Sequence, residues 1–399
     1  ASQPAAVYLG VSYYYSGGAT YESYWEGGID QVRIFNTALT SAQVEDLYTD
    51  ETTTTAATLD FPAGAGCVAA YQLDGNANDI STNNNGTTTN IGYTGLLFQP
   101  DFVWIKRRDG TENHYLQDSV RGSTQQIYSN LTDGQFNETT AVTSFSTNGF
   151  NMGSYNGINN SDEDYAAWCW KAGGTAADIT SSSTGVSAAS SSVNATAGFS
   201  IVTYTMSSTI VAVPHGLSSA PKMAIVKRTN TTSDWFIYNT VASGKGRGFF
   251  STSAFDNSGV PTFGATDFTF QDSDPFSTGS AVVYFFADVA GYQKIGTYTG
   301  NRPSTVTVYT TDDGTSTGAN GFKPSFLMIK DATTAAGENW IIVDNKREGA
   351  SAPTKVLYPN TNATEDPYSV ITFTSNGFTV GDTGLANTNG ATLIYLAIA

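Results

Sequence analysis

Pro100-Asp101-Phe102-Val103-Trp104-Ile105-Lys106 decides the fold, because the same pattern occurs three times in the chain. It returns as Pro221-Lys222-Met223-Ala224-Ile225-Val226-Lys227 and as Pro324-Ser325-Phe326-Leu327-Met328-Ile329-Lys330. Each copy is a proline, a nearly continuous apolar run and a lysine. This pattern predicts a buried strand that follows a proline-set turn and ends where its lysine reaches water. An internal repeat sets the architecture, and this one predicts tandem all-β modules.

A pair of residues four positions apart follows each copy. Each pair is a His or Trp followed by an Asp or Asn: His114 with Asp118, Trp235 with Asn239, and Trp340 with Asp344. Arginines stand three residues further at Arg121 and Arg347, whereas the second copy has Ala242. The motifs keep one order, so we treat the units as related copies.

Hairpin signals close the first and third units. Asn148-Gly149 and Asn376-Gly377 lie between apolar residues and predict type I′ turns, whose two central residues need positive φ. Each unit then ends on an apolar or aromatic strand, at residues 165–170, 282–286 and 393–398. Several strands per unit suffice for a small sandwich, so each repeat is predicted to be a domain rather than a solenoid rung.

Composition agrees with this class. A chain of 399 residues suggests three or four domains, and 40% hydrophobic residues permit packed cores. Aromatics at 13% and 40 glycines suit strands joined by tight turns. We predict an all-β fold of tandem β-sandwich modules, jelly-roll or concanavalin-like, with one short helix near residues 40–48. Thr40 and Gln43 form a capping box at its start.

The expected organisation has six parts. They are a partial module at 1–50, a linking β segment at 51–95, sandwich modules at 96–176, 198–292 and 293–399, and a Ser/Thr-rich connector at 177–197. The connector is either flexible or an exposed edge strand. Residues 294–300 (KIGTYTG) echo residues 91–95 (IGYTG), which suggests the same leading strand before each unit.

The net charge of the chain limits the classes of partner that it can bind. The formal net charge of −17 argues against nucleic-acid binding, which needs a basic patch. The basic clusters 106–108, 227–228 and 346–347 are interpreted as solvated strand ends that protect sheet edges. Cys67 and Cys169 form no disulfide framework, and Cys169 is expected to be a buried thiol. No run reaches the roughly 18 apolar residues of a membrane span, so no membrane insertion is predicted.

Two stretches near the N-terminus carry a resemblance. Residues 28–40 (GIDQVRIFNTALT) resemble the strand and helix that close laminin-G/concanavalin-like lectin domains. Residues 67–79 (CVAAYQLDGNAND) resemble the opening strand of such a domain. The resemblance therefore implies an end and a beginning of lectin-like modules, in that order.

A second resemblance covers the rest of the chain. Its motifs are QPDFVWIK at 99–106, DSVRG at 118–122, TSF at 143–145, AWCWK at 167–171, GFSIVTYT at 198–205, VPHGL at 213–217 and PKMAIVK at 221–227. Together they are similar to modules of marine (cyano)phage tail-fibre and virion structural proteins. The resemblance implies a virion appendage exposed on the particle surface.

Candidate catalytic and metal sites are few. Asp74, Asn76 and Asn78 place oxygen ligands at the spacing that Ca²⁺ favours, with an Asx-rich turn as the alternative. His114 occupies the position of Trp235 and Trp340, which predicts a strand residue rather than a base, and His215 is expected to pack in a turn. Carboxylates cluster at 162–164, at 272 with 274, and at 312–313, but no cluster recurs in all modules, so no catalytic residue is assigned.

Aromatic residues give the best glycan candidate. Tyr13, Tyr14, Tyr15, Tyr24 and Trp25 flank a glycine pair, and exposed aromatics stack on sugar rings. Burial against other strands or another subunit is the alternative reading.

These observations favour a non-enzymatic phage tail fibre or related appendage that attaches to host-surface glycan. The expected partners are other virion proteins, a host polysaccharide or receptor, and two further copies in a homotrimer. The trimer follows from the family resemblance. A capsid or tail decoration protein and a polysaccharide depolymerase stay open, and a bacterial adhesin is disfavoured.

Overall fold

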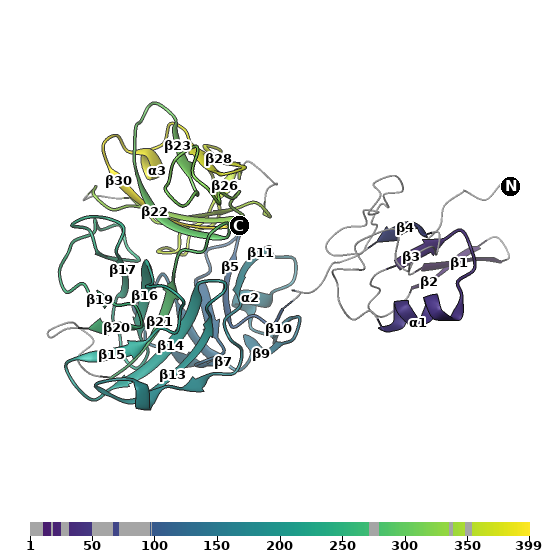
Figure 1. Cartoon of the computed structure of the whole chain (residues 1–399), viewed down its shortest axis with the longest axis horizontal. Helices are drawn as coiled ribbons and strands as arrows, with labels where there is room; N and C mark the ends of the chain where they lie inside the picture. The colour runs from purple at the N-terminus through teal and green to yellow at the C-terminus, as the bar shows by residue number, and fades with distance from the viewer. Residues whose placement is uncertain are drawn as a thin grey trace. The chain divides into compact units, whose positions relative to one another are not determined.

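The computed structural model describes residues 11–16, 19–24, 32–49, 67–71, 96, 98–270, 279–334, 338–347 and 353–399. These belong to two compact units, Ala1–Gly95 and Leu96–Ala399. Almost every described element is a strand in an antiparallel ladder, and the helices are short (Figure 1). The all-β prediction is confirmed.

The first unit contains two strand pairs. β1 (Val11–Ser16) and β2 (Ala19–Tyr24) form a hairpin. β3 (Val32–Phe35) pairs with β4 (Cys67–Tyr71), so the closing strand and the opening strand of the lectin-like stretches are neighbours.

Helix α1 (Ser41–Thr49) begins where the capping box predicts. The Gln43 amide N–H donates to Oγ1 of Thr40 at 3.3 Å, and the Thr40 N–H donates to Oε1 of Gln43 at 3.0 Å. These two bonds satisfy backbone donors that a helix leaves free at its start.

The second unit contains three repeats: repeat 1 (96–176), repeat 2 (177–292) and repeat 3 (293–399) (Figure 1). Each has a larger and a smaller antiparallel sheet. In repeat 1 the larger sheet has the strand order β11 (Tyr165–Trp170), β5 (Phe102–Arg107), β6 (His114–Asp118), β7 (Gly122–Tyr128) and β8 (Phe136–Asn137). The smaller sheet consists of β10 (Gly149–Met152) and β9 (Val142–Ser146), and this repeat also contains the helix α2 (Asn156–Asn159).

Repeats 2 and 3 follow the same plan with different numbers of strands. The larger sheet of repeat 2 has the strand order β12 (Ala177–Asp178), β13 (Val186–Asn194), β14 (Phe199–Met206), β21 (Gly279–Phe286), β16 (Met223–Arg228), β17 (Trp235–Asn239) and β18 (Arg247–Phe249). Its smaller sheet has the order β15 (Val211–Pro214), β20 (Asp267–Phe270) and β19 (Thr262–Phe263), and this repeat also contains the 3-10 turn η1 (Thr180–Ser182).

The larger sheet of repeat 3 has the strand order β22 (Gln293–Thr299), β30 (Thr392–Ile398), β24 (Phe326–Asp331) and β25 (Ile341–Asp344). Its smaller sheet has the order β23 (Val306–Tyr309), β29 (Gly377–Val380) and β28 (Ile371–Thr374). This repeat also contains the strand pair β26 (Lys355–Val356) and β27 (Asp366–Pro367) and the helix α3 (Gly384–Asn387).

The three Pro-to-Lys segments are the same strand of their sheets, as predicted. β5 lies between β11 and β6, β16 between β21 and β17, and β24 between β30 and β25. Their apolar runs are continuous because both faces of each strand are buried. On β5, Phe102 and Trp104 face one core, and Val103 and Ile105 face another.

The first of these cores is shared by all three repeats. It contains Trp104 of repeat 1, Ile225 of repeat 2 and Met328 of repeat 3, the same position in each copy. The other faces form three local cores, one between the two sheets of each repeat. The three sandwiches meet in this common core and belong to one compact unit.

The segment 177–197 is part of a sheet. Its strand β13 lies between β12 and β14 in the larger sheet of repeat 2. The stretch therefore forms strands and not a flexible connector, but β13 lies inside the sheet and not at an exposed edge.

The two Asn-Gly hairpins form, but not with type I′ turns. Ser146 pairs with Gly149, so Thr147 and Asn148 are the central residues, and Thr374 likewise pairs with Gly377. Among the described non-glycine residues, only Asp162 and Asn320 have positive φ. The glycine instead begins the second strand, with φ of 156° at Gly149, a conformation that favours glycine.

Candidate functional site

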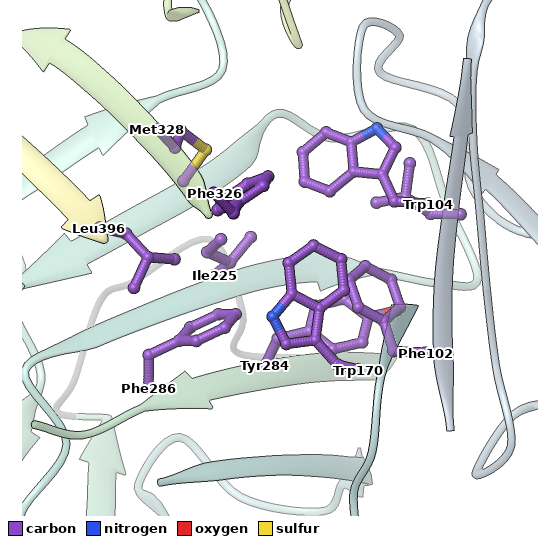
Figure 2. A pocket seen from close by; sticks show the side chains of 10 residues that line it. Phe102, Trp104, Trp170, Ile225, Tyr284, Phe286, Phe326, Met328 and Leu396 are labelled. Atoms are coloured by element: carbon purple, nitrogen blue, oxygen red, sulfur yellow. The ribbon is translucent and has the colours of Figure 1, made fainter. Parts of the chain in front are cut away.

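The shared core is the structural centre of the second unit. Figure 2 shows aromatic and aliphatic side chains of all three repeats converging there, among them Trp170, Tyr284 and Phe326. The rings of Phe102 and Tyr284 stack with centroids 4.4 Å apart. The cavity that remains is about 10 Å³, about the minimum for one water molecule, so this centre is a packed core and not a ligand site.

Backbone hydrogen bonds join the repeats in a cyclic order. The N–H groups of Gln135, Phe255 and Glu365 donate to the carbonyls of Thr229, Ala332 and Arg108 at 2.7, 2.9 and 2.8 Å. These bonds run from repeat 1 to 2, from 2 to 3 and from 3 to 1. The three repeats therefore close a ring within one chain.

Indole groups add two hydrogen bonds between repeats, in the opposite sense. Nε1 of Trp235 donates to the Tyr128 carbonyl, and Nε1 of Trp340 donates to the Phe249 carbonyl, both at 2.7 Å. His114, fully buried in β6, takes the equivalent place in repeat 1 and accepts from Nε1 of Trp104 at 2.9 Å.

The environment of His114 fits a structural role. Burial and the nearby Lys106 charge hold the pKa of His114 well below its ordinary value, with the Tyr358 backbone acting the other way. The imidazole is therefore neutral at pH 7. The prediction that it is a strand residue agrees with this position.

The repeated lysines are buried, which corrects the prediction that they are solvated strand ends. Lys106, Lys227 and Lys330 have no exposed surface. Lys227 Nζ donates to carbonyls of Ser233 and Arg228 in its own repeat and of Thr132 in repeat 1, at 3.0 to 3.1 Å. Lys330 Nζ similarly reaches the Thr252 carbonyl of repeat 2 at 3.4 Å.

These ammonium groups bond to carbonyl oxygens instead of water. Burial lowers the pKa of Lys106, Lys227 and Lys330 to about 8 in each case. Lys227 and Lys330 therefore fasten loops across the boundaries between repeats, whereas Lys106 Nζ donates to the Arg107 and Gly110 carbonyls of its own repeat.

A buried ion pair stands at the interface of repeats 1 and 2. Nε of Arg121 donates to Oδ2 of Asp118 at 2.5 Å, and both side chains are almost fully buried. The hydroxyl of Tyr284, in repeat 2, donates to the same carboxylate oxygen at 2.7 Å. Burial opposes the charge of Arg121, but Asp118 outweighs it and raises the pKa of the guanidinium.

The interface of repeats 3 and 1 has the equivalent pair with further charges. Arg347 donates to Asp344 and to Glu365, both at 2.5 Å, and Arg108 of repeat 1 donates to Glu365 at 2.9 Å. Nε1 of Trp168 in repeat 1 donates to Asp344 at 3.1 Å. Burial opposes ionisation of Glu365, yet Arg108 and Arg347 hold the pKa of its carboxyl below the ordinary range.

Repeat 2 lacks the buried Asp–Arg pair of the other two repeats, and its neighbour, repeat 3, lacks the aromatic donor that would contact it. Leu396 of repeat 3 stands at the position of Tyr284 and Trp168 in the sheet register and has no polar group to donate. Repeat 2 has Asn239 and Ala242 where the others have aspartate and arginine. Ala242 and Leu396 are both buried in the shared core, so apolar contact takes the place of the ion pair at this position of the interface.

The predicted glycan residues lie mostly in the first unit's hairpin. Tyr13, Tyr14 and Tyr15 are in β1, and Tyr24 is in β2 opposite Val11. Trp25 lies outside the described residues. The aromatic cluster stays a prediction.

The predicted Ca²⁺ ligands Asp74, Asn76 and Asn78 also lie outside the described residues. Within the described part of the chain, no group of three or more His, Cys, Asp or Glu side chains is arranged to hold a metal ion.

The described carboxylate clusters have structural partners. Glu163 pairs with Arg107 and accepts from Tyr165, and Asp313 caps its own turn through the Thr315 N–H. His215 is buried and accepts the Leu217 N–H at 3.1 Å, which fits the predicted turn role. Cys169 is only partly buried, although burial raises the pKa of its thiol to about 12.

A surface groove of about 200 Å³ lies between repeats 1 and 2. Its walls are about equally polar and apolar. They carry Gln135, Ser190, Thr203, Thr205, Thr229 and Ser280 beside Val120, Ala188, Ala189 and Ala281, with Arg121 and Tyr204 also present. The hydroxyl and amide groups are of the kind that hydrogen-bond a neutral polar ligand such as a sugar residue.

Sequence reasoning missed this groove and the polar interface residues. The sequence did contain one indication of the groove: Thr203, Thr205 and Ser280 are polar residues on central strands, where apolar residues are usual. In the described part of the chain, no helix is long and apolar enough to span a membrane.

Comparison with known proteins identifies the family of this chain. Residues 76–399, well over half of the chain, match the family described as "Domain of unknown function (DUF7483)". No curated protein and no solved structure matches the chain.

Proposed function

Because the chain belongs to the DUF7483 family, whose description names no function, we propose a role from its own residues. The protein is a structural and adhesive component of a virus particle, a tail fibre or related appendage, that contacts host-surface glycan. It acts outside the particle and without catalysis.

One observation carries the proposal: the three sandwiches share a single aromatic core and close a ring within one chain. Such a body is stiff, because the repeated strand of each larger sheet is buried on both faces. Stiff sandwiches that hold variable loops suit surface attachment. The motifs similar to marine phage fibre modules point the same way.

Two surfaces are candidates for glycan contact. The first is the tyrosine-rich hairpin of β1 and β2. The second is the hydroxyl-lined groove between repeats 1 and 2. Weak contacts at these surfaces would gain strength in a multivalent particle. We also propose a homotrimer, which light scattering of the full chain at micromolar concentration tests.

The adhesive role is tested by binding labelled protein to host cells and to purified host polysaccharide. Ala188→Trp fills the exposed mouth of the groove, and Ser187→Trp, on the exposed neighbouring residue of β13 outside the groove lining, is the matched control. If only Ala188→Trp loses binding, the groove is the site of glycan contact. If both variants lose binding equally, or neither does, the glycan contacts the protein elsewhere.

Antibody labelling of intact virions tests the location. A few copies at the tail support a fibre, whereas many copies over the capsid support a decoration protein. New reducing ends after incubation with polysaccharide would contradict the non-catalytic role and support a depolymerase.

A further inference from the structure

Two glutamine side chains lie inside the sandwich of repeat 1. Gln117 of β6 and Gln126 of β7 have no exposed surface. Gln117 is on the same face of β6 as Tyr115, and Gln126 is on the same face of β7 as Tyr128, because alternate residues of a strand share a face. Tyr115 belongs to the local core of repeat 1, and Tyr128 packs against that core. Both amides therefore lie between the larger and the smaller sheet.

Most polar atoms of these two amides have no hydrogen-bond partner. In the described part of the chain, neither Nε2 nor Oε1 of Gln117 has one, and Oε1 of Gln126 has none. Nε2 of Gln126 donates over a long 3.4 Å to the Tyr128 hydroxyl. Buried polar groups are normally paired, and one without a partner destabilises the folded state. The sandwich of repeat 1 thus contains hydrogen-bonding capacity that its own residues do not use.

The fold itself does not require glutamine at these positions. The ladder between β6 and β7 has the same register as the bridge between β25 and the segment of β26 in repeat 3. In that register Val343 takes the place of Gln117, and Val356 takes the place of Gln126. Both valines are fully buried in the local core of repeat 3. Repeat 1 therefore has two amides where packing alone is served by valine.

The β9–β10 hairpin covers this part of the larger sheet. Val142 of β9 is fully buried in the same local core as Tyr115. Oγ of Ser123, on β7, donates to the Thr143 carbonyl of β9 at 2.9 Å. The hairpin therefore lies over the strands that carry the two glutamines.

This hairpin is held less firmly than its counterpart in repeat 3. Among the described strands, β9 and β10 form a sheet of their own, whereas β28 and β29 are joined by β23. Met152 of β10 is 43% exposed, whereas Val380 at the same place in β29 is 0% exposed. Over the described residues, the local core of repeat 1 is also smaller than that of repeat 3. Segments with few buried apolar contacts open at a low free energy.

The surface beneath the hairpin has the chemistry of a site for an uncharged sugar. The two amides provide both donors and acceptors. Tyr128 and Tyr155, whose hydroxyls are 3.4 Å apart, add aromatic rings that pack against the same core. Amides beside aromatic rings suit a ligand that carries hydroxyl groups on an apolar ring.

We propose that the β9–β10 hairpin is a lid, and that its opening exposes Gln117, Gln126 and Tyr128 as a binding site for an uncharged sugar residue. The unpartnered amides favour opening, because a ligand or solvent then satisfies them. The site is separate from the groove between repeats 1 and 2, whose lining contains neither glutamine. The choice of ligand rests on the proposed glycan attachment, whereas the lid does not.

Hydrogen exchange of the full chain tests the lid. Amides of β9 and β10 should exchange at least about tenfold faster than those of β28 and β29. Gln117→Val/Gln126→Val reproduces the valines of repeat 3, so it should slow exchange in β9 and β10 by about tenfold and raise the urea midpoint. Gln125→Val, at a half-buried position on the other face of β7, is the matched control and should change neither quantity.

The lid is overturned if the two hairpins of the wild type exchange equally. It is also overturned if the double variant speeds or leaves unchanged the exchange of β9 and β10, or lowers the urea midpoint. The amides would then be satisfied in the closed protein.

Binding of labelled protein to purified host polysaccharide tests the site. Val142→Ala trims a buried contact of the hairpin and keeps both glutamines, so it should enlarge the open fraction. Apparent affinity should then rise by the factor by which hairpin exchange speeds up, about tenfold, since only the open form binds. Gln117→Val/Gln126→Val should instead weaken binding by at least about tenfold, because it removes the hydrogen-bonding groups. Gln125→Val should bind like the wild type.

The site and the attachment function fail in different ways. If the wild type binds the polysaccharide and either Val142→Ala or the double variant binds with unchanged affinity, the site is overturned and glycan attachment stands. If the wild type does not bind, glycan attachment and the choice of ligand fail together, and hydrogen exchange alone decides the lid.

Discussion

The hydroxyl of Tyr284 donates to Oδ2 of Asp118 at 2.7 Å, across the boundary between repeats 2 and 1. Both side chains are buried, and the same oxygen also receives Nε of Arg121. Trp168 and Asp344 form the corresponding bond between repeats 1 and 3, whereas the third interface has apolar Leu396 and Ala242 at the equivalent position. The three interfaces therefore differ in chemistry at this position.

Tyr284→Phe should lower the free energy of unfolding by about 1–3 kcal/mol, because it removes one donor from a buried carboxylate. Tyr395→Phe is the control: this hydroxyl has only a long bond of 3.4 Å to the Tyr309 carbonyl and lies in the local core of repeat 3. Urea unfolding measures both. An equal or larger loss in the control would show that the Asp118 bond has no special weight.

The sequence predicts the strand positions well because burial of both faces leaves a visible apolar run. It did not predict the ring. Phe102 and Val103 are both apolar, so the sequence does not say that one faces a neighbouring repeat and the other faces its own sandwich. The lysines were misread for a related reason: a terminal lysine normally reaches water, and the carbonyls around Lys227 come from loops far apart in sequence, including Thr132.

Stability should rise between pH 8 and pH 10. Burial lowers the pKa of Lys106, Lys227 and Lys330 to about 8 in the folded chain, whereas an unfolded lysine titrates near 10.4. In this window the unfolded chain binds more protons, so the unfolding free energy increases with pH, by up to about 1.4 kcal/mol per unit for each lysine. Urea unfolding at several pH values below 10 measures the slope.

Lys227→Met should remove about a third of that slope, because three equivalent lysines share it. The control is Lys171→Met, at an exposed position, which should leave the slope unchanged. A wild-type slope of zero would mean that the three ammonium groups are not desolvated in solution.

Stability should fall as the pH drops from 6.5 to 5. Burial lowers the pKa of His114 and of His215 in the folded chain, so the unfolded chain takes up protons first. Unfolded carboxyl groups titrate mainly below this range, near 4. His114→Phe should reduce the loss in this window, and an unchanged pH profile would remove His114 as its cause.

Glu365→Gln should destabilise the protein by about 3–5 kcal/mol, since it leaves Arg108 and Arg347 without their shared buried carboxylate. Asp382→Asn is the matched control. Its partner is Arg302, and the two side chains are 56% and 54% exposed, so the loss should stay below about 1 kcal/mol. Thermal and urea midpoints compare the two, and equal effects would mean that the Glu365 cluster is solvated.

Phe102→Ala should loosen all three repeats, because Phe102 belongs to the shared core. Removing a buried phenyl group costs about 3–5 kcal/mol, and here the cavity borders Tyr284 of repeat 2 and Trp170 of repeat 1. Hydrogen exchange should then speed up in β5, β16 and β24 together. Phe378→Ala removes an equally buried ring from the local core of repeat 3 and should speed exchange mainly there. If Phe102→Ala affected β5 alone, the repeats would be separate domains that touch, and the common core would not join them.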